Sequence, residues 1–130
     1  MLGLAIVMLI DAAASPAAPI PSRTPIGTFQ ISPGKAVTRV EMTRVDFLPG
    51  QEMPEHMHPV PVACVVAKGN FVVSIGSEPV RKLGVSETTI EPAGEVVHYF
   101  RNLSSVQSAQ LYCSILAGPD DKVLSVMLSK

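Results

Sequence analysis

Two histidines one residue apart are the strongest chemical signal in this sequence. His56 and His58 flank Met57 in the stretch PEHMHPVPV. Successive side chains of a β-strand point to opposite faces, so both imidazoles leave the same face of an extended segment. The third histidine of the chain, His98, lies in the separate stretch VVHYF. Three imidazoles from two strands would form a facial site for a divalent metal, with positions left open for water or substrate. Exposed histidines at a sheet edge would give the same short pattern.

Short strands are the elements that must position these histidines. From residue 35 onward, β-branched and apolar runs alternate with turns that contain glycine and proline, and a helical period is nearly absent. The expected strands are AVTRVEMTRVDFL, VACVVAKG, FVVSIG, SETTIEP, VVHYFRN, AQLYCSILAG and KVLSVMLS. Gly69 and Asn70 predict a tight hairpin, and a slip in the apolar phase near Thr43 predicts a bulge or a strand break. The pattern predicts an all-β antiparallel sandwich or barrel.

Two motifs in the sequence resemble those of the cupin superfamily. The first motif has a glycine, H-x-H, a glutamate and a second glycine, and its spacing fits Gly50, His56, His58, Val62 and Gly69. Val62 stands in the place of the glutamate. The second motif fits more loosely through Ser86, Pro92, Gly94, His98 and Asn102. Ser86 stands in the place of a glycine, and three residues instead of two separate Gly94 from His98. The resemblance covers roughly residues 35 to 128 and is strongest to small exported single-domain cupins.

The resemblance implies an all-β fold, the cupin-type β-barrel, a double-stranded β-helix of two packed antiparallel sheets. It also implies a divalent transition metal in the barrel mouth, with His56, His58 and His98 as its ligands. Imidazole accepts Fe, Zn, Mn, Ni and Cu, so the metal stays open. An apolar Val62 cannot coordinate, so a three-histidine site would leave the charge of the metal uncompensated. Such a site would favour a small anionic ligand.

The carboxylate that is missing at Val62 has three possible replacements in the sequence. Gln51 and Glu52 lie in the loop before the histidine pair, and Glu91 lies just before Pro92. A solvated loop carboxylate is the simpler interpretation of Glu91. No residue of the chain is singled out as a catalytic acid or base.

The N-terminal part of the chain has the composition of a targeting segment. Residues 1–20 are interpreted as a signal peptide, because the apolar run MLGLAIVMLI is followed by an alanine-rich stretch. The run is too short for a membrane-spanning helix. It departs from a typical signal peptide in one respect, because no Lys or Arg precedes it. Residues 21–34 are expected to form an extended linker or N-terminal arm, and residues 35–130 the cupin domain. We therefore expect export to a periplasmic or extracellular location, with no stable membrane span after cleavage; a buried N-terminal strand or helix is the alternative.

The two cysteines, Cys64 and Cys113, are both expected to point inward from their strands. An exported protein with an even number of cysteines can form a disulfide. Packing as plain buried thiols is the first interpretation, a disulfide the second, and metal ligation the third.

Composition narrows the possible functions. The formal net charge is −1 and charged residues make up 16% of the chain, so no basic face is available for nucleic acid. The resemblance to cupins implies the leading hypothesis, a metal-dependent small-molecule enzyme of the non-haem oxygenase type. A non-catalytic metal- or ligand-binding module is the alternative, followed by a structural barrel with a vestigial site. A homodimer is expected, because single-domain cupins associate through their sheet faces.

Overall fold

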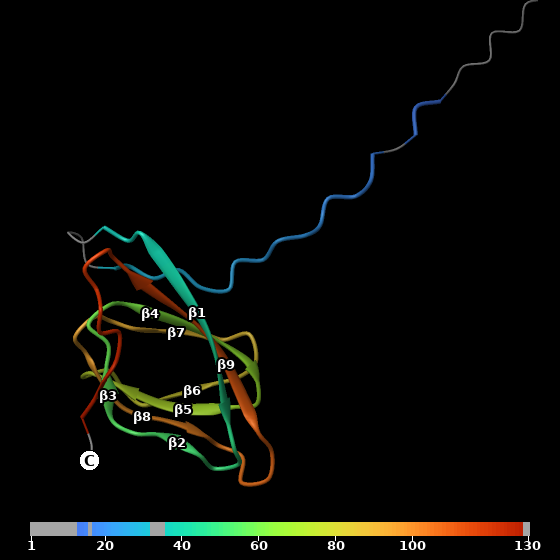
Figure 1. Cartoon of the computed structure of the whole chain (residues 1–130). Coiled ribbons are helices and arrows are strands. Elements are labelled where there is room, and N and C mark those ends of the chain that lie inside the picture. Colours follow the sequence, from blue (N-terminus) through green and yellow to red (C-terminus); the bar gives the residue numbers. More distant parts are fainter. Residues whose placement is uncertain (1–12, 16, 32–35, 129–130) are drawn as a thin grey trace, which may run out of the picture.

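The computed structural model describes residues 13–15, 17–31 and 36–128, and the strands among them form two antiparallel sheets (Figure 1). These strands are β1 (Arg39–Phe47), β2 (Glu52–Met53), β3 (His56–Met57), β4 (Val62–Lys68), β5 (Phe71–Ile75), β6 (Arg81–Leu83), β7 (Thr88–Glu91), β8 (Val96–Asn102), β9 (Ala109–Ala117) and β10 (Val126–Met127). The first sheet has the order β1-β9-β4-β7. The second has the order β10-β3-β8-β5-β6, and β2 pairs with β8.

The core lies between the two sheets and is built mainly from alternate residues of β4, β5 and β9, together with Phe47 of β1, Leu83 of β6, and Val97 and Phe100 of β8. The rings of Phe47 and Phe100 both flank Phe71, with centroids 5.0 and 5.3 Å from it and nearly perpendicular planes. Aromatic rings prefer such edge-to-face contacts. Inward-facing Val, Leu and Ile residues of both sheets complete the cluster. The expected all-β fold of two packed antiparallel sheets is confirmed.

β1 is one continuous strand, so the bulge or break expected near Thr43 is wrong. Its register with β9 runs without a shift from Arg39 to Phe47. Val40 and Met42 point outward and are 52% and 68% exposed, whereas Phe47 points into the core. The apparent slip in phase arises because β1 carries apolar residues on both of its faces.

The hairpin expected at Gly69 and Asn70 is also wrong. β4 and β5 belong to different sheets. The turn between them therefore leads from one sheet to the other and does not join two paired strands. Gly69 has a φ of +81°, and a Cβ there would lie 2.7 Å from the Cβ of Ala109. The glycine is needed both for this backbone angle and for this close approach.

Residues 13–15 and 17–31 precede the strands. The last part of this arm, from about Ile26, lies beside β7, and the earlier part extends away from the two sheets (Figure 1). The arm is held where it meets β7, because the Oγ1 of Thr88 donates a hydrogen bond to the carbonyl of Ile26 at 3.1 Å. Most of the expected signal peptide lies outside the described residues. Within the part of the chain that the structure describes, no helix has the length and hydropathy needed to cross a bilayer.

Candidate metal centre

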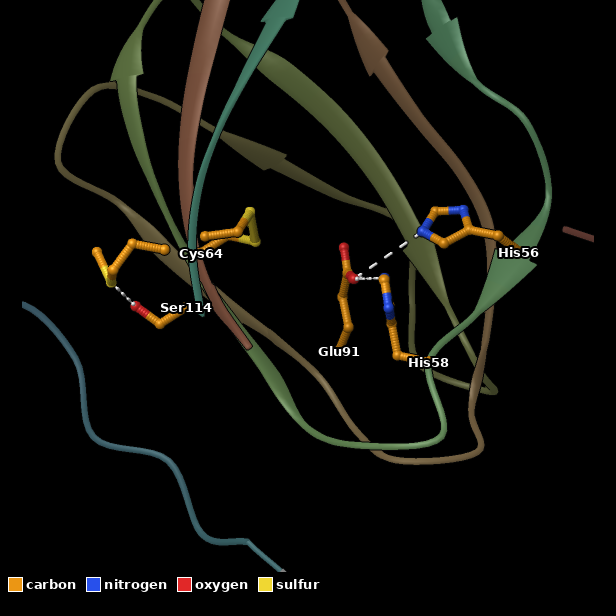
Figure 2. The surroundings of a disulfide bond; sticks show 7 residues. His56, His58, Cys64, Glu91 and Ser114 are labelled. Carbon is orange, nitrogen blue, oxygen red and sulfur yellow. Dashed lines mark hydrogen bonds and ion pairs between the residues drawn. A yellow bond between two sulfur atoms is a disulfide. The ribbon is translucent and has the colours of Figure 1, made fainter. Parts of the chain in front are cut away.

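Three side chains, two of them buried and one partly buried, converge inside the mouth of the sandwich. They are His56 at the start of β3, His58 just after that strand, and Glu91 at the end of β7. The Oε2 atom of Glu91 lies 3.0 Å from the Nε2 of His58 and 3.9 Å from the Nε2 of His56. Figure 2 shows both imidazoles pointing toward this carboxylate. The two histidines therefore share a face as their spacing predicts, and a carboxylate lies between them.

The other ring nitrogen of each histidine is held by the backbone. The Nδ1 of His56 lies 2.7 Å from the carbonyl of Pro54, and the Nδ1 of His58 lies 2.5 Å from the carbonyl of Leu124. A carbonyl can only accept, so each Nδ1 carries the proton and donates it. The two Nε2 atoms are thereby aimed at Glu91. Metal-binding histidines in proteins are oriented by the same kind of contact.

The carboxylate also changes the protonation of its neighbour. Burial of the His58 ring disfavours its charged form, but the hydrogen bonds to Glu91 and to the Leu124 carbonyl outweigh this effect. The pKa of His58 is therefore raised above its ordinary value.

Glu91 stands directly across a strand pair from Val62. The register of β4 with β7 makes these two residues partners, so their side chains lie on one face, about 5 Å apart at Cβ. Val62 is buried and makes no polar contact, which agrees with its expected role as an empty ligand position. The interpretation of Glu91 as a solvated loop carboxylate is wrong, since Glu91 is a strand residue with 5% exposure. Gln51 and Glu52 are exposed and lie outside the cluster.

His98 lies outside the cluster, and the structure does not bring the expected three histidines together. Its side chain is 44% exposed, and its Nδ1 lies 3.1 Å from the Oε2 of Glu55 on the outer face. The cause is an irregularity in β8, where Ser74 pairs with Tyr99 but Ile75 pairs with Val97. The extra residue is His98, and a bulge of this kind turns one side chain out of the ladder.

Val97 takes the inward position that the motif assigns to a histidine. It follows Gly94 at the spacing of two residues that the second motif requires. Val97 is fully buried and pairs with His56 across β3 and β8. The motif has two residues between its glycine and its histidine, whereas this chain has three between Gly94 and His98. This difference in spacing was the sequence signal that the histidine is displaced by one position.

The donor set of the cluster fits a divalent transition metal. His56, His58 and Glu91 each offer one ligand atom, and these atoms all lie within 4.8 Å of one another. Two donors bound to one ion at about 2.1 Å lie roughly 3.0–3.4 Å apart, so the 3.0 Å pair already fits and the 3.9 Å pair needs only a small shift. Two imidazoles and one carboxylate form the facial triad typical of non-haem iron, and the same set also suits zinc and manganese.

A cavity of about 130 Å³ opens beside the cluster between the two sheets. A cavity of this size suits a small molecule and not a polymer. Apolar side chains make most of its wall: Val45, Phe47, Met53, Val62, Phe100, Leu111, Ile115 and Met127. Besides the cluster, Thr43 and Ser125 contribute hydroxyl groups, and the disulfide-bonded Cys113 completes the lining.

Cys64 and Cys113 form a disulfide, so their interpretation as plain buried thiols is wrong. They are directly opposite partners in β4 and β9, with Cα atoms 4.1 Å apart. Both point inward as predicted, and Figure 2 shows the bridge on the sheet that carries Glu91. The bridge cross-links the two central strands of the wall opposite the histidines.

Two further residues of the second motif have structural roles. Ser86 has a φ of +70°, the left-handed conformation that explains why the motif places a glycine there. Asn102 is buried, and its Nδ2 donates to the carbonyls of Leu48 and Gln107 at 3.0 and 2.7 Å. Its Oδ1 accepts from the backbone of Ser104 at 3.0 Å. Asn102 therefore joins the loop between β1 and β2 to the loop between β8 and β9.

Comparisons with known proteins identify the same fold. Residues 43–115 match the family model described as the cupin domain. A solved oxalate oxidase in complex with the substrate analogue glycolate is 28% identical, with a TM-score of 0.58 over 68% of this chain and 46% of that chain. None of the curated proteins matches the sequence.

Two more solved structures share the fold at lower identity. The DMSP lyase DddQ from Ruegeria pomeroyi is 17% identical, with a TM-score of 0.58 over 68% of this chain and 42% of that one. An oxalate decarboxylase from Bacillus subtilis is 16% identical, with a TM-score of 0.60 over 68% of this chain and 24% of that one. The chain spans less than half the length of each of these three proteins.

Proposed function

Since this chain belongs to the cupin family, we propose that it binds one divalent transition metal through His56, His58 and Glu91 and acts on a small anionic molecule. The observation that supports this most directly is the pair of backbone contacts to the Nδ1 atoms, which leave both Nε2 atoms facing one buried carboxylate. A divalent cation bound at this position would offset the charge of the buried carboxylate.

The proposed activity is that of a metal-dependent small-molecule enzyme of the non-haem oxygenase type. When bound, such a metal supplies Lewis-acid or redox chemistry at coordination positions that the protein leaves open. The chain itself holds three donors on one side, and its apolar cavity walls exclude water from the bound molecule.

A non-catalytic binding module is the second candidate, and the cavity lining favours it. Among the described residues that line the cavity, the only groups that can exchange a proton at neutral pH are those of the cluster. Any catalytic proton transfer would have to use a bound water or the substrate itself.

Metal analysis of the purified protein tests the proposed site. Wild type should hold close to one metal ion per chain, and the paired change His56→Ala, His58→Ala should abolish binding. Equal metal content in both proteins would refute the site. For an iron-loaded protein, oxygen consumption with panels of small thiols, diketones and carboxylic acids separates the enzyme from the binding module.

We also propose that the protein works in an exported compartment. The disulfide between Cys64 and Cys113 supports this, because such bridges form and persist in oxidising compartments. Expression with and without residues 1–20, followed by cell fractionation, tests the proposal. Retention of the full chain in the cytoplasm with both thiols reduced would contradict it.

A homodimer through the outer face of β1 and β9 is proposed as the assembly. Val40, Met42 and Tyr112 expose 52%, 68% and 42% of their surface on this face. The ion pair Arg44–Asp46 lies on the same face of β1, and its opposite charges can pair with a two-fold related copy. Light scattering should give twice the monomer mass for wild type and the monomer mass for Met42→Glu. A monomeric wild type at high concentration would contradict the proposal.

A further inference from the structure

The cavity beside the cluster has one charged end and an uncharged wall. Thr43, Ser125 and Met127 are exposed and mark the mouth, whereas Phe47 and Leu111 are buried and mark the interior. No Lys or Arg is found among the described residues that line the cavity. A ligand inside it therefore meets fixed positive charge only at the cluster.

The charge of the cluster limits the charge of its ligand. With neutral imidazoles, His56 and His58 contribute nothing, and Glu91 contributes one negative charge. A divalent ion held by these residues leaves a net charge of +1, compared with +2 for the three-histidine site that the sequence suggested. A monoanion neutralises this charge, whereas a dianion leaves one negative charge in a cavity without a cation to pair with it. An unpaired buried charge is strongly unfavourable.

The rest of the cavity wall indicates that the ligand also carries a hydrocarbon group. The side chains of Phe47, Val62, Phe100 and Leu111 are at most 3% exposed and present hydrocarbon to the cavity. Contact with this wall removes apolar ligand surface from water, which favours binding by about fourfold for each methylene group. The volume of about 130 Å³ limits such a tail to a few carbons.

From these observations we infer that the site selects small monocarboxylates with a short hydrocarbon tail and discriminates against dicarboxylates of the same length. This inference rests on the proposed metal site and names the substrate class for it.

Matched pairs of ligands test the inference on the full-length metal-loaded protein. Metal content is measured first, and cobalt loading provides a visible spectrum that reports ligand exchange at the metal. Calorimetric titrations then compare acetate, butyrate and pentanoate, and pair butyrate with succinate and pentanoate with glutarate. Affinity should rise by about fourfold per methylene up to the cavity limit. Each dicarboxylate should bind at least about tenfold more weakly than its monocarboxylate partner, because of the unpaired charge.

A single change at the mouth should reverse the preference. Thr43 lines the cavity from β1 and is exposed, so Thr43→Arg adds a cation without disturbing the core. It should strengthen succinate relative to butyrate by about tenfold and leave the metal content unchanged. Thr43→Gln is the neutral control and should keep the wild-type preference.

The outcomes separate this inference from the proposed function. A wild-type protein that holds no metal overturns both. A protein that holds metal and binds succinate as tightly as butyrate overturns only the monocarboxylate inference. Affinity that stays flat from acetate to pentanoate overturns the role of the apolar wall.

Discussion

Replacing Glu91 with glutamine should remove most of the metal affinity while preserving the fold. The change keeps the size of the side chain but deletes the only carboxylate of the cluster, which lies 3.0 Å from His58 and 3.9 Å from His56. Four-ligand zinc sites bind with about 10–16 kcal/mol, or roughly 2.5–4 kcal/mol per ligand. Loss of one such ligand corresponds to a decrease in affinity of about two to three orders of magnitude.

The assay is competition for zinc or cobalt with a chromophoric chelator, together with circular dichroism to verify the fold. His98→Gln is the matched control: it removes the histidine that the second motif assigns to the site, but its side chain lies on the outer face. Wild type and His98→Gln should agree within about threefold, as is usual for surface changes. The reasoning is refuted if Glu91→Gln keeps wild-type affinity, or if His98→Gln loses as much affinity as Glu91→Gln.

Three further changes test the surroundings of the cluster. Replacing Cys64 and Cys113 with serine should lower the free energy of unfolding by about 4 kcal/mol, since the bridge closes a sequence separation of 49 residues, and urea denaturation beside wild type measures this. An unchanged urea midpoint in the serine variant would contradict this expectation. Val97→His should place an imidazole beside His56. Without metal it should lower the free energy of unfolding by about 1–3 kcal/mol, and in the chelator assay it should raise metal affinity at least about tenfold. A folded variant without this gain in affinity contradicts the assigned register. Ser86→Gly should raise stability by about 0.5–1 kcal/mol in thermal melts, because it relieves a left-handed backbone at a non-glycine residue; a loss of stability there would show that the strain is negligible.

The parts of the site that depend on local pattern could be predicted from the sequence. The H-x-H spacing places His56 and His58 on one face wherever the segment is extended, and both do face the cavity. The inward direction of Val62, Cys64 and Cys113 follows from the same alternation along their strands. A period of two residues is fixed by backbone geometry and needs no knowledge of the partner strand.

The parts that depend on the register between distant strands could not be predicted. Glu91 completes the cluster only because β7 pairs with β4 in the register that sets it opposite Val62. His98 leaves the cluster because β8 has one extra residue where it pairs with β5. A shift of one residue exchanges the two faces of a strand, so a small uncertainty in register decides whether a side chain is a ligand or a surface group.

The contact between His58 and the carbonyl of Leu124 couples metal binding to the docking of the C-terminal segment, residues 123–128. The segment reaches the barrel through the short pairing of β10 with β3, and Leu124 precedes that pairing. If docking of the segment improves ion binding by some factor, ion binding must strengthen docking by the same factor. Metal should therefore slow proteolysis of residues 123–128, and removal of these residues should weaken metal binding to a matching extent. In this protein residues 123–128 and the ion would act as reciprocal effectors, although this segment contributes none of the three candidate ligand atoms.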